Sequence, residues 1–237
     1  MGQTPGVFGL KTRAINFRSA LINWVRMPVC SALVLFSSAG TFDYCEAWIF
    51  LLVISSTTAA NYLYLLLNKS TLLDRRLAIG PAAEADKNQR YIQALIFFLF
   101  VLALAIPSID YRESKSAPSL ITIFFGNTIV FVGLLIRFWV FRENSFASAT
   151  IRVEQDQTVV SSGPYSSVRH PMYLSVLIVL LGTPIALGSS WGLVVLPLLT
   201  IVIAWRILDE ERFLLNALKG YENYTKSVRY RLIPYIW

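Results

Sequence analysis

Charged residues are scarce in this chain of 237 residues, because Asp, Glu, Lys and Arg together make up only 15% of it. A typical soluble domain carries about a quarter. Apolar residues fill the difference, at 55% of the chain and with a mean hydropathy of +0.56. This balance argues against a soluble protein with a very large core. It favours a polytopic membrane protein whose main partner is the lipid bilayer.

Cysteine and histidine are also rare, with two Cys and one His. Cys30 and Cys45 are too few for a disulfide framework, and their apolar surroundings indicate small buried side chains. Two cysteines and the single His170 are too few for a typical Cys-ligated zinc site, so we expect no metal. The N-terminal stretch lacks a compact apolar run before small residues, so no cleaved signal peptide is expected.

Long apolar runs make up most of the remaining sequence. A helix that crosses a bilayer needs about 20 predominantly apolar residues. Six candidate spans follow one another, at residues 20–38, 47–67, 91–106, 120–140, 173–187 and 191–208. The last two form a tight pair joined by Gly-Ser-Ser. We therefore predict an all-α fold, a polytopic membrane bundle of about six transmembrane helices with a C-terminal helical hairpin.

The excess of basic residues, a formal net charge of +7, gathers in the loops. It lies in the N-terminal arm, in 69–90, in 142–172 and in the C-terminal segment, and six spans place all four on one side. The other side has only Arg112 and Lys115, beside acidic residues. Because Lys and Arg favour cytoplasmic loops, we expect both termini in the cytoplasm. Because cytoplasmic loops account for the positive charge, we expect no nucleic-acid partner.

Polar residues near the membrane concentrate in two segments, 142–172 and 209–237. The tight helical pair separates them along the chain, so they should meet at its cytoplasmic end. We accordingly divide the chain into 1–141, with four spans, and 142–237, a C-terminal core that carries the polar chemistry.

The first polar segment ends in Arg169-His170-Pro171, directly before an apolar run. Pro171 suits the first turn of a helix, where its missing N–H costs nothing. Arg169 and His170 would then lie at a helix N-terminus, which favours a bound anion. The alternative is an Arg-His pair that only anchors the helix at the interface.

The second polar segment continues the last span as a helix. Arg206 and Glu210 are four residues apart and share a face, with Asp209 and Glu211 beside them. Three consecutive acids at a membrane boundary are costly unless they are solvated or paired. They predict either a binding wall or a solvated helix face with an internal ion pair.

Together, "GPYSSVRHPMY", a helical hairpin and "DEERFLL…GYENY…VRYRLIP" resemble the isoprenylcysteine carboxyl methyltransferase family and its phospholipid methyltransferase relatives. The resemblance covers residues 142–237 and implies an S-adenosylmethionine-dependent methyltransferase with a cytoplasmic cofactor site. It assigns Arg206 to the methyl acceptor, with Glu210 or Glu211 holding a polar part of the cofactor. The remaining cofactor residues that it implies are Gln157, Thr158, Val159, Val160, Tyr165, His170, Pro171, Met172 and Tyr173.

The acceptor decides whether the reaction needs a base. A carboxylate is already ionised at neutral pH, whereas an amine or a thiol must lose a proton. His170 is the one side chain whose usual pKa lies near neutrality, and we expect it to contact the cofactor rather than to act as a base. The membrane setting implies a lipophilic or lipidated acceptor that enters from the bilayer, and no residue chooses between a prenylated cysteine, a lipid amine and a small hydrophobic acid or thiol. The resemblance makes an isoprenylcysteine-like carboxylate the preferred acceptor.

Two other functions fit parts of the sequence. Membrane reductases of the steroid and sterol type have a similar C-terminal hairpin, but they use NADPH, and 142–172 shows no clear basic cluster for its 2′-phosphate. A transporter or scaffold would explain Arg26 and Arg137 within the spans. Arg137 lies near the end of its span, from which we expect it to reach the interface.

Overall fold

A computed structural model describes residues 7–77, 81–84, 86–114, 118–151, 153–154 and 156–237, with side chains from residue 17 onward. The chain is 77% helix, and the described residues contain no strand. This confirms the all-α prediction. Four basic residues of the loops that predict the orientation have side chains outside the described part: Lys11, Arg13, Lys115 and Arg152.

The helices follow the apolar runs and extend beyond them. They are α1 (Val7–Ala39), α2 (Cys45–Asn68), α3 (Ser70–Leu77), η1 (Pro81–Ala83), α4 (Lys87–Ser114), α5 (Leu120–Glu143), η2 (Gly163–Ser166), α6 (Pro171–Ala186), η3 (Trp191–Val194), α7 (Val195–Ala217) and α8 (Tyr221–Ser227). Five stretches are long and apolar enough to cross a membrane, and they contain α1, α2, α4, α5 and α7. The predicted fifth span corresponds to α6, which is apolar but shorter.

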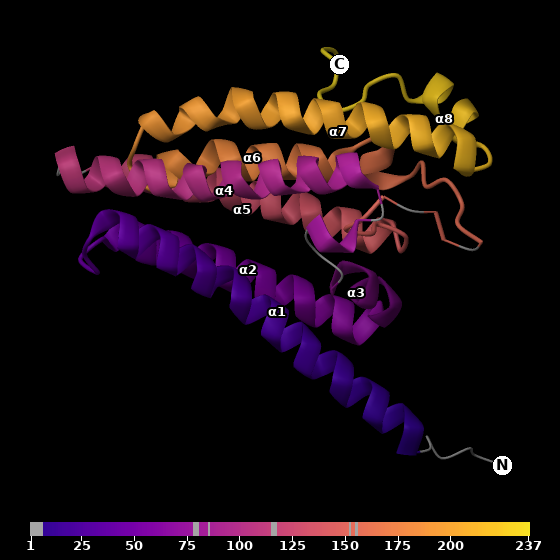
Figure 1. Cartoon of the computed structure of the whole chain (residues 1–237), viewed down its shortest axis with the longest axis horizontal. Coiled ribbons are helices and arrows are strands. Elements are labelled where there is room, and N and C mark those ends of the chain that lie inside the picture. Colours follow the sequence, from indigo (N-terminus) through magenta and orange to yellow (C-terminus); the bar gives the residue numbers. More distant parts are fainter. Residues whose placement is uncertain (1–6, 78–80, 85, 115–117, 152, 155) are drawn as a thin grey trace.

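The helices form two groups (Figure 1). α4, α5 and α6 lie side by side beneath α7, while α1 and α2 pack against α4 and α5 from the other side, and α1 diverges toward its N-terminus. The core lies between these layers, around Leu104, Val130 and Leu134 in one cluster and Leu199 and Ile203 in another. The chain therefore forms a multi-pass helical bundle of the membrane type.

Glycines bring α5 and α6 into close contact. A Cβ on Gly126 would lie 2.2 Å from the backbone nitrogen of Ala186, and one on Gly182 would lie 2.8 Å from the carbonyl oxygen of Gly126. Only a residue without a side chain permits this approach of two backbones. The contact fixes α6, and with it the Arg169-His170-Pro171 entry, against α5.

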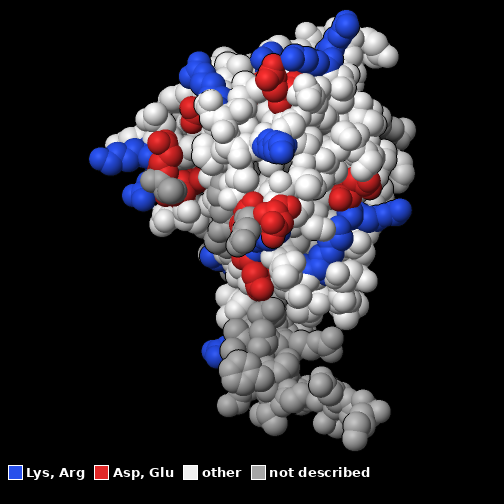
Figure 2. All heavy atoms as spheres, turned by 90° about the vertical axis from the view of Figure 1, so that its right-hand side faces the viewer, with Lys and Arg blue, Asp and Glu red and all other residues white. Residues whose placement is uncertain are grey.

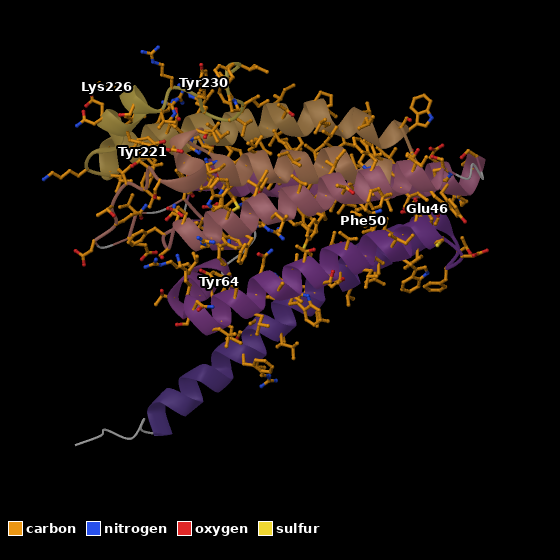
Figure 3. All side chains as sticks on the ribbon, turned by 180° about the vertical axis from the view of Figure 1, so that it is seen from behind. Glu46, Phe50, Tyr64, Tyr221, Lys226 and Tyr230 are labelled. Atoms are coloured by element: carbon orange, nitrogen blue, oxygen red, sulfur yellow. The ribbon has the colours of Figure 1, made fainter. Side chains whose placement is uncertain are left out.

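One end of the bundle, which we call the site end, holds α8, most of the first polar segment and the beginning of α1 (Figure 1). α3, α8 and the 144–170 segment gather there (Figure 1). Glu46 lies at the far end from Tyr221 and Lys226 (Figure 3). Lys, Arg, Asp and Glu side chains are mixed across the site end (Figure 2). The cytoplasmic location of this end stays a prediction.

Two details of the apolar helices differ from expectation. Cys30 and Cys45 are exposed rather than buried, since each lies on a helix face that no neighbouring helix covers. This corrects the prediction that both are core side chains. Arg26 is likewise exposed on α1 and is not part of the cavity described below.

Candidate functional site

A cavity of about 310 Å³ lies at the site end, where the two polar segments meet. This volume lies within the range of small-molecule sites. Eleven of the twelve predicted site residues line it: Gln157, Thr158, Val159, Val160, Tyr165, His170, Pro171, Met172, Tyr173, Arg206 and Glu210. Glu211 does not. The segment around Arg169-His170-Pro171 and the acidic segment of α7 thus line the same cavity, although a helical hairpin separates them in the sequence.

The entry to α6 is held by the C-terminal segment. Pro171 occupies the first turn, as predicted, and His170 precedes it in a non-helical conformation. The backbone N–H of Arg169 donates to the carbonyl of Tyr230 at 2.9 Å, and that of His170 donates to Arg231 at 2.8 Å. These two bonds attach the entry of α6 to residues 230–231 of the C-terminal segment.

The three consecutive acids of α7 each have a different partner, because successive residues of a helix point about 100° apart. Asp209 accepts a hydrogen bond from the side-chain amide of Gln89. Glu210 accepts from the hydroxyl of Tyr173 at 2.7 Å and faces the cavity. Glu211 turns toward the C-terminal segment. The acids are therefore neither a solvated face nor one shared wall.

Glu211 is the centre of a buried cluster behind the cavity wall. Its Oε1 lies 2.8 Å from Nε of Arg169 and 3.2 Å from Nε2 of His170, and its Oε2 lies 2.8 Å from Nε of Arg231. The Glu211 side chain is 8% exposed. This carboxylate joins α7, the α6 entry and the C-terminal segment.

Arg206 lines the cavity, and all three of its guanidinium nitrogens have partners. Nε donates to the Tyr173 hydroxyl at 2.8 Å, Nη1 to the Gln89 side-chain oxygen at 2.7 Å, and Nη2 to Oε1 of Glu84 at 2.7 Å. The Arg206 and Glu84 side chains are 4% and 1% exposed. The geometry resembles that of a fixed structural element more than that of a cation free to meet a ligand.

Two other arginines face the cavity, and the sequence analysis did not assign them to it. Nε of Arg137 is buried with no hydrogen-bond partner, and the side chain lies close enough to Arg76 for their charges to repel. Arg76 donates to the carbonyl of Ser148 at 2.9 Å and lies over the Phe141 ring. Burial lowers the pKa of Arg76 below its usual range.

Neither guanidinium forms an ion pair with a described carboxylate. Arg137 lines the cavity together with Arg76 and residues of the 144–151 segment. That its side chain reaches the membrane interface stays a prediction. An arginine within an apolar span was itself the available signal, since such residues usually face a bundle interior or a cavity.

Tyrosines form the opposite wall. The Tyr165 hydroxyl accepts from the side-chain amide of Asn144 at 2.9 Å, and the Tyr224 hydroxyl donates to the carbonyl of Tyr165 at 2.7 Å. Burial raises the pKa of Tyr165 to about 12. The Tyr221 hydroxyl is buried without a partner among the described residues and lines the cavity. The wall thus offers aromatic rings and one free polar group.

Residues 121–220 match the family model described as phospholipid methyltransferase. The matched segment is 100 of the chain's 237 residues. The family includes the isoprenylcysteine carboxyl methyltransferases, so the resemblance drawn from the two motifs is confirmed. A comparison with curated proteins finds no match.

The methyltransferase segment starts within α5 and therefore includes Arg137, whereas Arg76, Glu84 and Gln89 precede it. Its start lies upstream of the boundary predicted at residue 142. The division of the chain into 1–141 and 142–237 stays a prediction.

Proposed function

We propose that this protein transfers a methyl group from S-adenosylmethionine to a lipophilic acceptor in the membrane. The preferred reaction is carboxyl O-methylation of an isoprenylcysteine-like substrate. One observation carries the proposal: both predicted motifs line a single cavity at the polar rim of an apolar bundle. The family match supports the reaction class.

The cavity residues suit the donor. Tyrosine rings beside Val159 and Val160 offer an apolar, aromatic surface for a purine ring. Glu210 and the unpartnered Tyr221 hydroxyl offer an acceptor and a donor for its polar groups. When bound, S-adenosylmethionine supplies a methyl group on a positively charged sulfur. The protein supplies the orientation and a site with little water, both of which lower the barrier.

The acceptor end of the cavity favours an anion. Arg76 and Arg137 present positive charge that no described carboxylate neutralises. Arginine binds a carboxylate with well-defined geometry, and a carboxylate needs no general base at neutral pH. In this reaction a carboxylate oxygen bonds to the methyl carbon as the carbon–sulfur bond breaks, and the electron pair stays on sulfur. No proton moves.

Arg206, predicted to approach the acceptor, has a different part in this proposal. Its nitrogens are occupied by Tyr173, Gln89 and Glu84, so it holds the Tyr173 hydroxyl against Glu210 at the border between donor and acceptor. His170 forms part of the donor wall. Its Nε2 lies against Glu211, and this favours a fixed contact over a mobile base.

A reductase is the second candidate, because two unpaired guanidinium groups would also suit the 2′-phosphate of NADPH. Thermal unfolding of the purified protein with S-adenosylhomocysteine or NADPH separates the two, since a ligand that binds only the folded state raises the unfolding midpoint. We expect S-adenosylhomocysteine to raise it and NADPH to leave it unchanged. The reverse result would contradict the methyltransferase proposal. Binding of neither ligand would favour a transporter or scaffold.

The acceptor class is tested by incubating the protein with membranes and S-adenosylmethionine labelled in its methyl group. A carboxyl methyl ester releases labelled methanol in alkali, whereas an N-methyl or S-methyl product does not. We expect most of the transferred label to be volatile after alkali. If the label stays with the lipid after alkali, the methyltransferase proposal still holds, but the acceptor is not a carboxylate.

A further inference from the structure

Glu84 is a buried carboxylate that comes from outside the family-matched segment. It directly follows η1 and precedes α4, and its side chain is 1% exposed. Its Oε1 accepts hydrogen bonds from Arg206 at 2.7 Å and from Gln93 at 3.1 Å, and its Oε2 accepts from the backbone N–H of Ile151 at 3.2 Å. Both oxygens of Glu84 already accept hydrogen bonds within the protein, and Glu84 does not line the cavity.

Arg206 lies between two carboxylates, one in direct contact with it and one connected through another side chain. Glu84 contacts it directly, whereas Glu210 contacts it through the Tyr173 hydroxyl, which accepts from Arg206 and donates to Glu210 at 2.7 Å. Glu210 therefore keeps its charge toward the cavity while Glu84 neutralises the arginine. Of the two acids, only Glu210 lines the cavity.

Loss of the Glu84 charge would change this arrangement. A buried guanidinium without a partner is strongly unfavourable and draws in the nearest carboxylate. For Arg206 that carboxylate is Glu210, four residues along the same face of α7. The new pair would withdraw Glu210 from the donor site, although no cavity residue had been altered.

We propose that Glu84 is a positioning residue for donor binding, which keeps Arg206 away from Glu210 so that the Glu210 carboxylate stays available to S-adenosylmethionine. The inference rests on the proposed function. It makes the segment between α3 and α4 a working part of the site, although the family match begins 37 residues later, at residue 121.

The test measures the Kd of S-adenosylhomocysteine for the full chain in detergent. Glu84→Gln keeps the shape of the side chain and removes its charge, and it should weaken binding at least tenfold. Glu210→Gln should weaken binding to a similar extent. The variant that carries both Glu84→Gln and Glu210→Gln should bind no more weakly than Glu210→Gln alone, because both changes remove the contact between Glu210 and the donor. Unchanged binding in Glu84→Gln, or fully additive losses, would overturn the proposal.

A charge-neutral pair distinguishes positioning from a general loss of structure. Glu84→Gln combined with Arg206→Gln leaves neither an unpaired cation nor a competitor for Glu210, so it should bind S-adenosylhomocysteine at least threefold more tightly than Glu84→Gln and than Glu210→Gln. Because Arg206 lines the cavity, binding equal to the wild type is not expected. Binding as weak as that of Glu210→Gln would refute the proposal, whether or not Glu84→Gln alone folds. Glu222→Gln, at an exposed glutamate of α8 outside the cavity, is the matched control and should bind normally.

Failure of the proposed function has a different outcome. If the wild type itself does not bind S-adenosylhomocysteine, the methyltransferase proposal fails. If the wild type binds S-adenosylhomocysteine and Glu84→Gln binds it equally well, only the positioning role of Glu84 fails.

Discussion

Nε2 of His170 lies 3.2 Å from Oε1 of Glu211, and both side chains are buried at the boundary between the cavity and the C-terminal segment. The same oxygen of Glu211 also contacts Arg169, and its other oxygen contacts Arg231. His170 is thus a cavity residue whose orientation is set from behind. This arrangement leads to two of the predictions below.

Replacement of His170 should affect donor binding more than proton transfer. His170→Ala removes part of the cavity wall and one contact of Glu211, so we expect weaker cofactor affinity and a pH profile of the same shape. A cofactor titration and a pH–rate series on the variant provide the measurement. Unchanged binding together with loss of the acid limb of the profile, where a base becomes protonated, would identify His170 as a base instead.

Replacement of Glu211 should act on stability. Glu211→Ala leaves the buried Arg169 and the partly exposed Arg231 without their anion, and the loss of one partner of a buried ion pair costs about 3–5 kcal/mol. Chemical denaturation of the purified protein measures it. Glu222→Gln, which removes one partner of an exposed pair with Lys226, is the control and should leave stability unchanged. A Glu211→Ala protein as stable as the control would show that the buried cluster contributes nothing.

Replacement of Arg137 should act on the acceptor. A hydrogen bond to a charged group contributes about 1.5–3 kcal/mol, so Arg137→Ala should lower kcat/KM for a carboxylate acceptor by about 10–100-fold. The Kd of S-adenosylhomocysteine should change little. Arg26→Ala is the control, because Arg26 is exposed and outside the cavity. If Arg137→Ala instead weakens only donor binding, the two guanidinium groups belong to the donor site.

The contact between α5 and α6 should not tolerate a larger residue. Gly126→Ala places a Cβ within 2.2 Å of backbone atoms that cannot move independently. Overpacking of this kind typically costs about 1–3 kcal/mol, and backbone contact makes the upper part of that range the expected value. The thermal midpoint measures the effect, with Ala60→Leu on the exposed face of α2 as control. Equal midpoints would mean that the helices separate at no cost.

Prediction from the sequence succeeded where a property belongs to a stretch of chain. Apolar length located α1, α2, α4, α5 and α7, and Pro171 marked the start of α6. The α6 span illustrates the limit, because hydropathy detects its apolar character but not that it stops at Ala186. The order of the two polar segments around the hairpin was enough to bring eleven residues to one cavity.

The sequence could not distinguish between neighbouring residues. Glu210 and Glu211 are adjacent and chemically identical, yet one faces the cavity and the other a buried cluster, because the rotation of α7 about its axis is set by packing. Glu84 was missed for a related reason. It acquires its partners from α4, α7 and the 144–151 segment, and no local pattern marks it.

Composition and apolar periodicity by themselves determined that this chain is a helical membrane protein with its polar chemistry at one end, since transfer of side chains into lipid depends on their identity. The tertiary structure decided which charges neutralise one another. Glu84 pairs with Arg206, Glu211 pairs with Arg169 and Arg231, and Arg76 and Arg137 are left facing the cavity. Ion pairs depend on distances of a few ångströms, and only the packing of the helices fixes those distances.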